Sequence, residues 1–341
     1  MWPRRNSPGN RRRRAVGPPP PPAAPPQQPA GQSFANLAPS LLALFNAGRR
    51  QFGRLQTIDD GLGPVFNGRS CGECHNAPAP GGGSERLVTR IGTITNGRFD
   101  PLTSSGGSLL QNRGLNPQLG STHAFRGENV PPNANLALGM QTVGKFGWKA
   151  QVPTLFQFAG DAYLNEQGIT NPFFPNENCP SGNCNELQFN PRPGLNDGGE
   201  DTRAVTDFMT LLAAPPRGPI ASDEVFNRIG CNACHVATLQ TGSNMVASLN
   251  RVTYSPYSDF LLHDMGALGD GIAQGAANGR EIRTAPLWGL RFVTTYLHDG
   301  RTRTLEGAIA AHDGQGRAAR ERFNALNATD RTRLLAFLRS L

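Results

Sequence analysis

The sequence predicts a mainly α-helical protein made of two similar modules with long loops, preceded by a disordered tail. The first 34 residues are rich in Pro, Ala, Gln and Arg, and a segment of this composition cannot bury a core. The rest of the chain contains several apolar helical stretches, and its 41 glycines and 29 prolines suit short helices joined by long loops. The pattern V-F-N-x-x-x-C-x-x-C-H occurs twice, ending at His75 and at His235, which indicates an internal duplication.

The boundaries of the modules follow from composition. We assign residues 1–34 to the tail, residues 35–217 to the first module and residues 218–341 to the second module, with a linker at P-P-R-G. At 341 residues the chain is long enough for two domains, each with its own core. An amphipathic helix, L-L-A-L-F-N-A-G-R-R-Q-F, is expected to lead toward the first cysteine motif.

The duplication extends beyond the cysteine motifs. Trp148 and His298 are each followed, seven residues later, by a leucine. Each module then ends in an expected apolar helix, V-T-D-F-M-T-L-L-A-A in the first and R-T-R-L-L-A-F-L-R-S-L in the second. Asn327 and Asp330 are placed for a capping-box-like start of the last helix.

The net charge of +8 is high enough for a nucleic-acid-binding protein, but its distribution argues against that class. Six of these charges come from arginines of the tail, namely Arg4, Arg5, Arg11, Arg12, Arg13 and Arg14. The remaining chain carries only +2, so we expect no specific nucleic-acid partner. We expect no transmembrane segment either, because no run of 18 apolar residues exists.

The two C-x-x-C-H motifs predict covalent attachment of two c-type haems. In such a motif both cysteines form thioether bonds with the haem, and the adjacent histidine ligates the iron. A redox C-x-x-C does not need the histidine, and half of a zinc site would not predict the repeated V-F-N. The expected haem-binding residues are Cys71, Cys74 and His75 for the first haem, and Cys231, Cys234 and His235 for the second.

This prediction bears on the compartment and on the remaining cysteines. Because c-type haem is normally attached outside the cytoplasm, we expect a periplasmic or otherwise exported protein, although no secretory signal is evident at Met1. Cys179 and Cys184 lie in the polar loop N-E-N-C-P-S-G-N-C-N-E. A local disulfide is the favoured interpretation for an exported protein, while two free thiols or metal ligands stay open as alternatives.

Longer motifs resemble one family. These are G-P-V-F-N-G-R-S-C-G-E-C-H, K-F-G-W-K-A-Q, D-A-Y-L-N-E-Q-G-I-T-N-P, Y-S-D-F-L-L-H-D-M-G and T-A-P-L-W-G-L…Y-L-H-D-G-R-T-R-T-L-E-G-A-I. Over about residues 40–341 the chain resembles the di-haem oxidoreductases, which are related to bacterial di-haem cytochrome c peroxidases. The resemblance implies two cytochrome-c-like domains and reduction of hydrogen peroxide. Electrons would come from a small redox protein, such as a cytochrome c or cupredoxin, or from an unidentified substrate.

The resemblance also suggests ligands for the second haem. In the related peroxidases an axial methionine follows the histidine of Y-x-H-D-G by fourteen residues, and the same count from His298 reaches His312. We therefore predict His312 as the second ligand of the iron above His235, with a solvent-facing helix-end histidine as the alternative. His298 and Asp299 are expected beside this haem, where the carboxylate would orient an imidazole that binds a propionate or water.

For the first haem, the resemblance suggests an accessible iron with a nearby acid–base group. Relatives with a distal histidine carry it near the position of Ile91, and no histidine occurs there. We predict an open or water-bound iron, unless His123 or Met140 ligates it. The distal glutamate of the family falls near Glu166, with Gln167 positioned to orient water or peroxide. The alternative for Glu166 is a charged loop residue without a catalytic role.

Two further assignments rest on the same resemblance. Trp148 corresponds to a tryptophan between the haems, where it could relay electrons or simply pack at an interface. The relatives also hold a calcium ion between the domains, for which Asn96 and Thr295 are candidates by position. The leading functional hypothesis is a di-haem peroxidase. The rivals are an electron-transfer cytochrome with two six-coordinate haems and an enzyme that oxidises residues of a partner protein.

Overall fold

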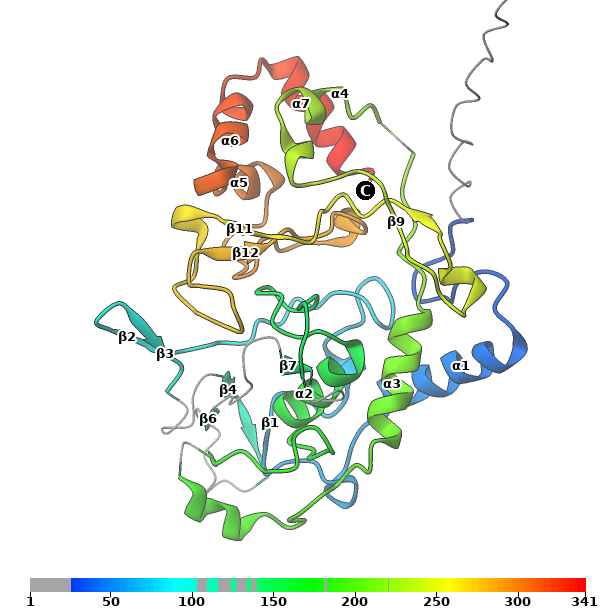
Figure 1. The fold of residues 1–341 in the computed structure, drawn as a ribbon, viewed down its shortest axis with the longest axis vertical. Coiled ribbons are helices and arrows are strands. Elements are labelled where there is room, and N and C mark those ends of the chain that lie inside the picture. Colours follow the sequence, from blue (N-terminus) through cyan, green and yellow to red (C-terminus); the bar gives the residue numbers. More distant parts are fainter. Residues whose placement is uncertain are drawn as a thin grey trace, which may run out of the picture.

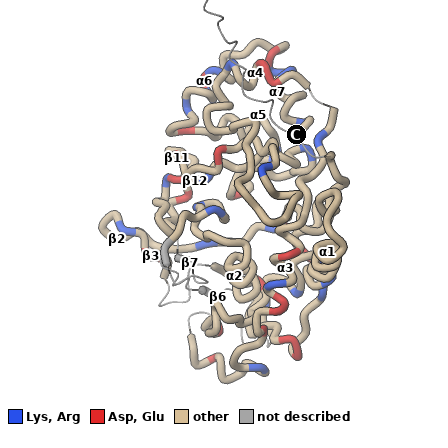
Figure 2. Tube along the Cα trace, turned by 45° about the vertical axis from the view of Figure 1, so that its right-hand side comes forward, with Lys and Arg blue, Asp and Glu red and all other residues tan. Residues whose placement is uncertain are grey.

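The computed structural model describes residues 26–102, 109–115, 124–126, 134–135, 140–180, 183–219 and 221–341. Helices α1 to α3 lie in the lower part of Figure 1, and helices α4 to α7 lie in the upper part. Figure 2 shows that Lys and Arg residues are interspersed with Asp and Glu over this part of the chain.

The core of the first module lies between three helices, α1 (Pro39–Gly53), α2 (Leu155–Gln167) and α3 (Glu200–Leu211). The Phe208 ring lies 5.1 Å from that of Phe45 and 5.0 Å from that of Phe52, measured between centroids. Helices α1 and α3 approach closely at Gly48, where an added Cβ would lie 2.1 Å from the Ala204 carbonyl oxygen. The apolar stretch that the sequence assigned to a first helix therefore packs against the helix that ends the same module.

Four shorter helices surround the core of the second module. They are α4 (Glu224–Arg228), α5 (Leu305–Ala310), α6 (Arg317–Asn324) and α7 (Ala328–Leu338). Phe226 and Phe337 are buried in this core with their ring centroids 5.2 Å apart. Asn327 caps α7 by accepting a hydrogen bond from the Asp330 amide at 2.9 Å, as its position before the apolar run suggested.

Short antiparallel hairpins accompany the helices, so the expectation of a mainly α fold is correct only in part. The described residues form six two-stranded sheets. The pairs are β1 (Val65–Phe66) with β5 (Arg113–Gly114), β2 (Thr93–Thr95) with β3 (Arg98–Asp100), β4 (Leu109–Gln111) with β6 (Ala124–Arg126), β7 (Ala134–Asn135) with β8 (Met140–Gln141), β9 (Leu239–Gln240) with β10 (Thr253–Tyr254), and β11 (Leu262–Asp264) with β12 (Glu281–Arg283). The backbone N–H and C=O groups of long loops need hydrogen-bond partners, and short strand pairs provide them. Such strands need no alternating pattern of apolar residues, so the sequence does not reveal them.

The end of the predicted tail is part of the folded chain. The Phe34 amide donates to the Leu211 carbonyl at 3.0 Å, and the Ala213 amide donates to the Gln32 carbonyl at 3.0 Å. Ser33 and Leu212 form the antiparallel bridge between these bonds. We assigned these residues to the tail from composition, and composition does not reveal which backbone groups form hydrogen bonds.

The duplication seen in the sequence is also present in the backbone. Phe146 bridges Val152 in the first module, and Tyr296 bridges Thr302 in the second. Each bridge is followed by a threonine that caps a helix: Thr154 accepts from the Gln157 amide ahead of α2, and Thr304 accepts from the Gly307 amide ahead of α5. The two turns thus place Trp148 and His298 at equivalent positions before equivalent helices.

Candidate haem-binding sites

Both C-x-x-C-H motifs adopt the same local structure. Each begins with a 3₁₀ turn, η2 (Cys71–Glu73) or η7 (Cys231–Ala233). The amide of the motif histidine donates to the carbonyl of the first cysteine, at 2.8 Å for His75 and 3.0 Å for His235. All four thiols are free of disulfides. Two thiols and an imidazole on one tight turn are the arrangement that attachment of a c-type haem requires.

The structure brings the rings of His235 and His312 close together, tilted by 53° relative to each other. Their ring centroids lie 6.4 Å apart. The Nδ1 of His235 is hydrogen-bonded to the Tyr257 carbonyl at 2.9 Å, and the Nδ1 of His312 to the Ala308 carbonyl at 2.8 Å. Both bonds leave Nε2 as the nitrogen that can ligate a metal, which is the usual orientation of a ligating histidine.

The spacing of these imidazoles fits one iron atom between them. An iron–nitrogen bond is about 2 Å long, so two axial imidazoles place their centroids about 6 Å apart. Burial lowers the pKa of His235 to about 4, although the Tyr257 carbonyl opposes this shift. Burial likewise lowers the pKa of His312. Both rings are therefore neutral at physiological pH, as metal ligation requires.

A second group of side chains lies beside Cys234. The His263 Nε2 is 2.9 Å from the Asp259 carboxylate, while its Nδ1 lies 3.1 Å from Gln315 Oε1 and 3.8 Å from the Cys234 sulfur. Cys234, Asp259 and His263 come close enough to suggest a metal site. However, the histidine meets the carboxylate and the thiol through opposite ring nitrogens, so one ion cannot use the contacts seen here. Sequence reasoning assigned neither His263 nor Asp259 to a site.

The first motif has a different environment. His75 is exposed, and its Nδ1 lies 3.3 Å from the Gly82 carbonyl. Within the described residues no second imidazole faces it in the way that His312 faces His235. His123, the histidine named as an alternative ligand, lies outside the described residues. The side chain of Met140, the other alternative, is not described either.

Glu166 and Gln167 lie beside this first motif, at the C-terminal end of α2. The Gln167 Nε2 is 3.4 Å from the Cys71 sulfur, and the Glu166 Oε2 accepts a hydrogen bond of 2.8 Å from Asn67. Burial raises the pKa of the Cys71 thiol to about 12, with a smaller contribution from the Glu166 carboxylate. The buried Oε1 of Gln167 has no hydrogen-bond partner, which leaves an acceptor next to the motif.

Trp148 and His298, which are equivalent in the duplication, meet where the two modules join. Their ring centroids lie 6.1 Å apart in an edge-to-face arrangement. His298 is buried, and its Nε2 has no hydrogen-bond partner. Burial lowers the pKa of His298, and the carboxylates of Asp299 and Asp270 oppose this shift. Within the described residues, the Asp299 carboxylate is bonded to Arg301 and not to an imidazole, and the binding of a propionate or water by His298 stays a prediction.

A buried lysine that the sequence did not reveal connects the modules at the same place. Lys149 is 1% exposed, and its ammonium group donates to Asp270 at 2.8 Å and to the Glu281 carbonyl at 2.8 Å. Next to it, the Arg283 amide donates to the Trp148 carbonyl at 2.8 Å. These bonds fix the segment that carries Trp148 against the second module. Lysine in K-F-G-W-K gives no sign of burial, because its partners lie more than 120 residues away.

The predicted calcium ligands are not brought together by any contact. Asn96 lies at the exposed turn between β2 and β3. Thr295 lies beside Gly300, and its neighbour Thr294 donates a hydrogen bond of 2.6 Å to the Glu85 carboxylate. The calcium site therefore stays a prediction.

Cys179 and Cys184 form a disulfide, with Cα atoms 4.4 Å apart. Its loop packs on the C-terminal end of α2, where the Asn178 side chain donates to the Leu164 carbonyl at 3.3 Å. Burial raises the pKa of the neighbouring Glu177 to about 8, against the effect of a hydrogen bond from Asn190. The loop thus supports the helix end that carries Glu166.

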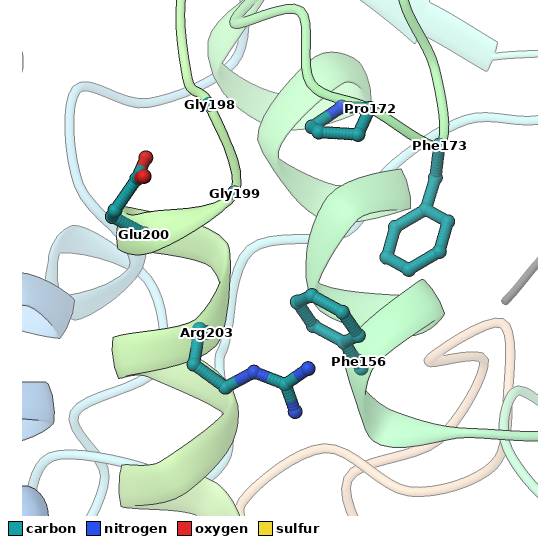
Figure 3. Close-up of a pocket in the computed structure, with 7 residues that line it drawn as sticks. All are labelled: Phe156, Pro172, Phe173, Gly198, Gly199, Glu200 and Arg203. Atoms are coloured by element: carbon teal, nitrogen blue, oxygen red, sulfur yellow. The ribbon is translucent and has the colours of Figure 1, made fainter.

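A surface pocket of about 560 Å³ lies at the other end of α2 (Figure 3). The Arg203 guanidinium lies 3.7 Å from the centroid of the Phe156 ring, which contacts Phe173 edge to face at 4.7 Å. Pro172, Gly198, Gly199 and Glu200 complete the lining. Ten residues of helix, about 15 Å, separate Phe156 from Glu166, so the pocket is distinct from the haem-binding motifs.

Comparison with known proteins identifies the family. The chain matches the family described as "Di-haem oxidoreductase, putative peroxidase" over residues 140–341, a range that includes the second C-x-x-C-H motif. No functionally curated protein matches the chain significantly. Within the described residues, no helix is long and apolar enough to cross a membrane.

Two solved structures are similar to the chain. One is a hydrazine synthase of Kuenenia stuttgartiensis, with 15% identity, a TM-score of 0.40 and coverage of 97% of this chain and 100% of the other. The second is a MauG-like protein associated with microbial copper homeostasis, with 17% identity, a TM-score of 0.42 and coverage of 93% of this chain and 92% of the other.

The two cysteine motifs and the family match indicate a redox protein with two haem sites. The family match covers more than half of the chain, so the protein belongs to the di-haem oxidoreductase family. The family resemblance predicted from the sequence is therefore confirmed, and haem is the cofactor that membership implies.

Proposed function

We propose that this protein is a di-haem c-type peroxidase that reduces hydrogen peroxide at the His75 site and receives electrons through the His235 site. The observation that carries the proposal is the difference between the two sites. His312 lies opposite His235 at the spacing of a second axial ligand, whereas the first motif has Glu166 and Gln167 beside it. At the second site, His312 would occupy an axial position of the iron. At the first site, the Glu166 carboxylate could transfer protons instead.

Reduction of one hydrogen peroxide molecule to two water molecules consumes two electrons and two protons. When bound, the first haem supplies the iron that binds peroxide, and the second haem exchanges electrons with it. Glu166 would take the proton from the near peroxide oxygen and return it to the leaving oxygen. Gln167, with a free buried Oε1, would orient peroxide or water by accepting a hydrogen bond.

The residues of the second site suit electron transfer. His235 and His312 would hold the iron as a pair of neutral imidazoles, and two strong axial ligands favour electron transfer over ligand binding. Trp148 would relay electrons at the junction of the modules, where its backbone is fixed by Arg283. The electron donor would be a small redox protein, such as a cytochrome c or cupredoxin, or an unidentified substrate.

Covalent attachment and export belong to the same proposal. All four motif thiols are available for thioether bonds, and c-type haem is attached outside the cytoplasm. The Cys179–Cys184 disulfide is consistent with such a compartment, because disulfides persist in oxidising environments.

Peroxide turnover of the haem-loaded protein, measured with an artificial electron donor, tests the proposal. We expect Glu166→Gln to lower kcat about 10²-fold to 10⁴-fold, the usual loss for a general acid–base residue. Glu321→Gln, which changes an exposed glutamate of α6, is the matched control and should leave turnover unchanged. Low-temperature EPR of the ferric protein should show one high-spin and one low-spin haem. Two low-spin haems that persist after partial reduction, together with no turnover, would favour an electron-transfer cytochrome instead.

A further inference from the structure

Both the backbone and the side chain of Glu166 are hydrogen-bonded to the segment that leads into the first cysteine motif. Its carbonyl accepts hydrogen bonds from the Asn67 amide at 2.7 Å and from the Gly68 amide at 3.1 Å. Its Oε2 accepts a third bond, of 2.8 Å, from the Asn67 side chain. Asn67 belongs to the V-F-N tripeptide four residues ahead of Cys71, so the same short segment carries the motif and holds Glu166.

The side-chain amide of Asn67 has only one suitable orientation. Its Oδ1 accepts a hydrogen bond of 3.0 Å from the Asn112 amide, which the pairing of β1 with β5 brings alongside. Turning the amide over would place its NH₂ group against this N–H and its oxygen against the Glu166 carboxylate. Because Asn67 is 8% exposed, neither group could turn to water instead. The donor Nδ2 therefore faces Glu166.

The repeat-related asparagine makes no comparable contact. Asn227 stands at the same distance ahead of Cys231, but it is exposed and lies within α4. Its hydrogen bonds join its backbone to the Asp223 carbonyl and to the Gly230 amide. The V-F-N tripeptide thus has a structural role in both modules, while a side-chain bond to a carboxylate occurs at Asn67.

We propose that Asn67 is a positioning residue that binds Oε2 of Glu166 and leaves Oε1 as the oxygen that accepts and returns the proton. This inference rests on the proposed peroxidase function. Oε2 already accepts a hydrogen bond from the Asn67 amide, and among the described residues no donor is seen at Oε1, so Oε1 is the oxygen left open to a proton. The bond also restricts rotation of the carboxylate, which holds Oε1 in one place during proton transfer.

The test uses Asn67→Asp, which keeps the shape of the side chain and the acceptor for the Asn112 amide. It replaces the donor by a carboxylate oxygen close to Glu166. The two carboxylates repel each other, so Oε2 of Glu166 loses its donor and the side chain is no longer held in place. Asn227→Asp is the matched control, because it makes the same chemical change at the exposed, repeat-related position.

Cyanide binding to the ferric, haem-loaded protein gives a readout that requires no turnover. Neutral hydrogen cyanide must lose its proton when it binds as the anion, so a nearby base accelerates its association. We expect Asn67→Asp to lower the association rate constant about 10-fold to 100-fold, and Asn227→Asp to change it less than about twofold. The rate constant for peroxide should fall in parallel. All variants are compared at equal haem content.

The double variant separates positioning from a general structural effect. If Asn67 acts through Glu166, adding Asn67→Asp to Glu166→Gln causes no further loss. A full, multiplicative loss in that background would overturn the inference, as would an unchanged rate in Asn67→Asp alone while Glu166→Gln is slow. A Glu166→Gln protein with the wild-type rates would instead remove the acid–base role on which both proposals depend.

Discussion

The two modules form their sites from the same elements in the same order, but the helix that completes each site differs in length and in the residues at its end. In each, a V-F-N segment leads into C-x-x-C-H, and a bridged turn with a capping threonine precedes a helix, α2 or α5. Helix α2 continues for 13 residues and ends with Glu166 and Gln167, whereas α5 stops after six and is followed by His312. The first motif therefore meets a carboxylate and an amide, and the second meets an imidazole.

This difference shows how a duplicated scaffold can support two kinds of chemistry. The proximal histidine, the thiols and the turn are shared, so they determine only that a haem can be held. Under the proposed function, the residue at the end of the following helix would decide whether the second axial position is filled or left to a substrate. Burial differs in the same direction, because His235 is half-buried against Phe226 of the second core and His75 is exposed.

Removal of the thiols has the largest expected effect. Cys71→Ala with Cys74→Ala, and separately Cys231→Ala with Cys234→Ala, should each lower covalently bound haem from two per chain to one, because no other thioether donors remain in that motif. Haem staining of the denatured protein and a pyridine haemochrome assay measure this. A pair whose removal leaves two covalent haems would break the equivalence of the two motifs.

Substitution in either core should destabilise its own module. Phe208 and Phe337 are 0% and 1% exposed, and replacing either by alanine should cost about 3–5 kcal/mol of unfolding free energy. Hydrogen exchange should report the loss in α1 and α3 for Phe208→Ala, and in α7 for Phe337→Ala. If either variant loosens both cores equally, the modules unfold as one unit and the predicted boundary near residue 217 is not a domain boundary.

Exchange of the proposed second ligand is the smallest of these effects. His312→Met should raise the reduction potential of the second haem on the order of 100 mV, or about 2.3 kcal/mol for one electron, because methionine ligation raises the potential of c-type haems. Potentiometry followed by optical spectra would show the shift. The first haem of the same protein is the internal control, and a potential that stays constant at both haems would mean that His312 is not a ligand.

Several site residues could be predicted because their signals are local. The C-x-x-C-H motifs, the Cys179–Cys184 loop and the cap at Asn327 each depend on residues within a few positions of one another. The repeat of V-F-N was visible in the sequence too, but the sequence could not show that Asn67 and Asn227 make different contacts. Their difference arises from residue 166, which lies 99 positions from Asn67 and reaches it only through the packing of α2.

The burial of Lys149 and the positions of the hairpins could not be predicted from the sequence, for related reasons. A lysine is normally exposed, and only three oxygen acceptors from the second module make its burial tolerable. The hairpins form in glycine-rich loops where side chains show no alternating pattern, so backbone pairing decides them rather than hydrophobicity.

The sequence by itself determined that the chain carries two C-x-x-C-H motifs in a duplicated framework with short helices, because such motifs and helix periodicity are encoded in short stretches. The tertiary structure decided which side chains meet those motifs. It placed His312 opposite His235, Glu166 against Asn67, and Lys149 against the second module. Such contacts depend on how helices that are far apart in the sequence pack against one another. This packing is decided by the whole core and not by any short segment.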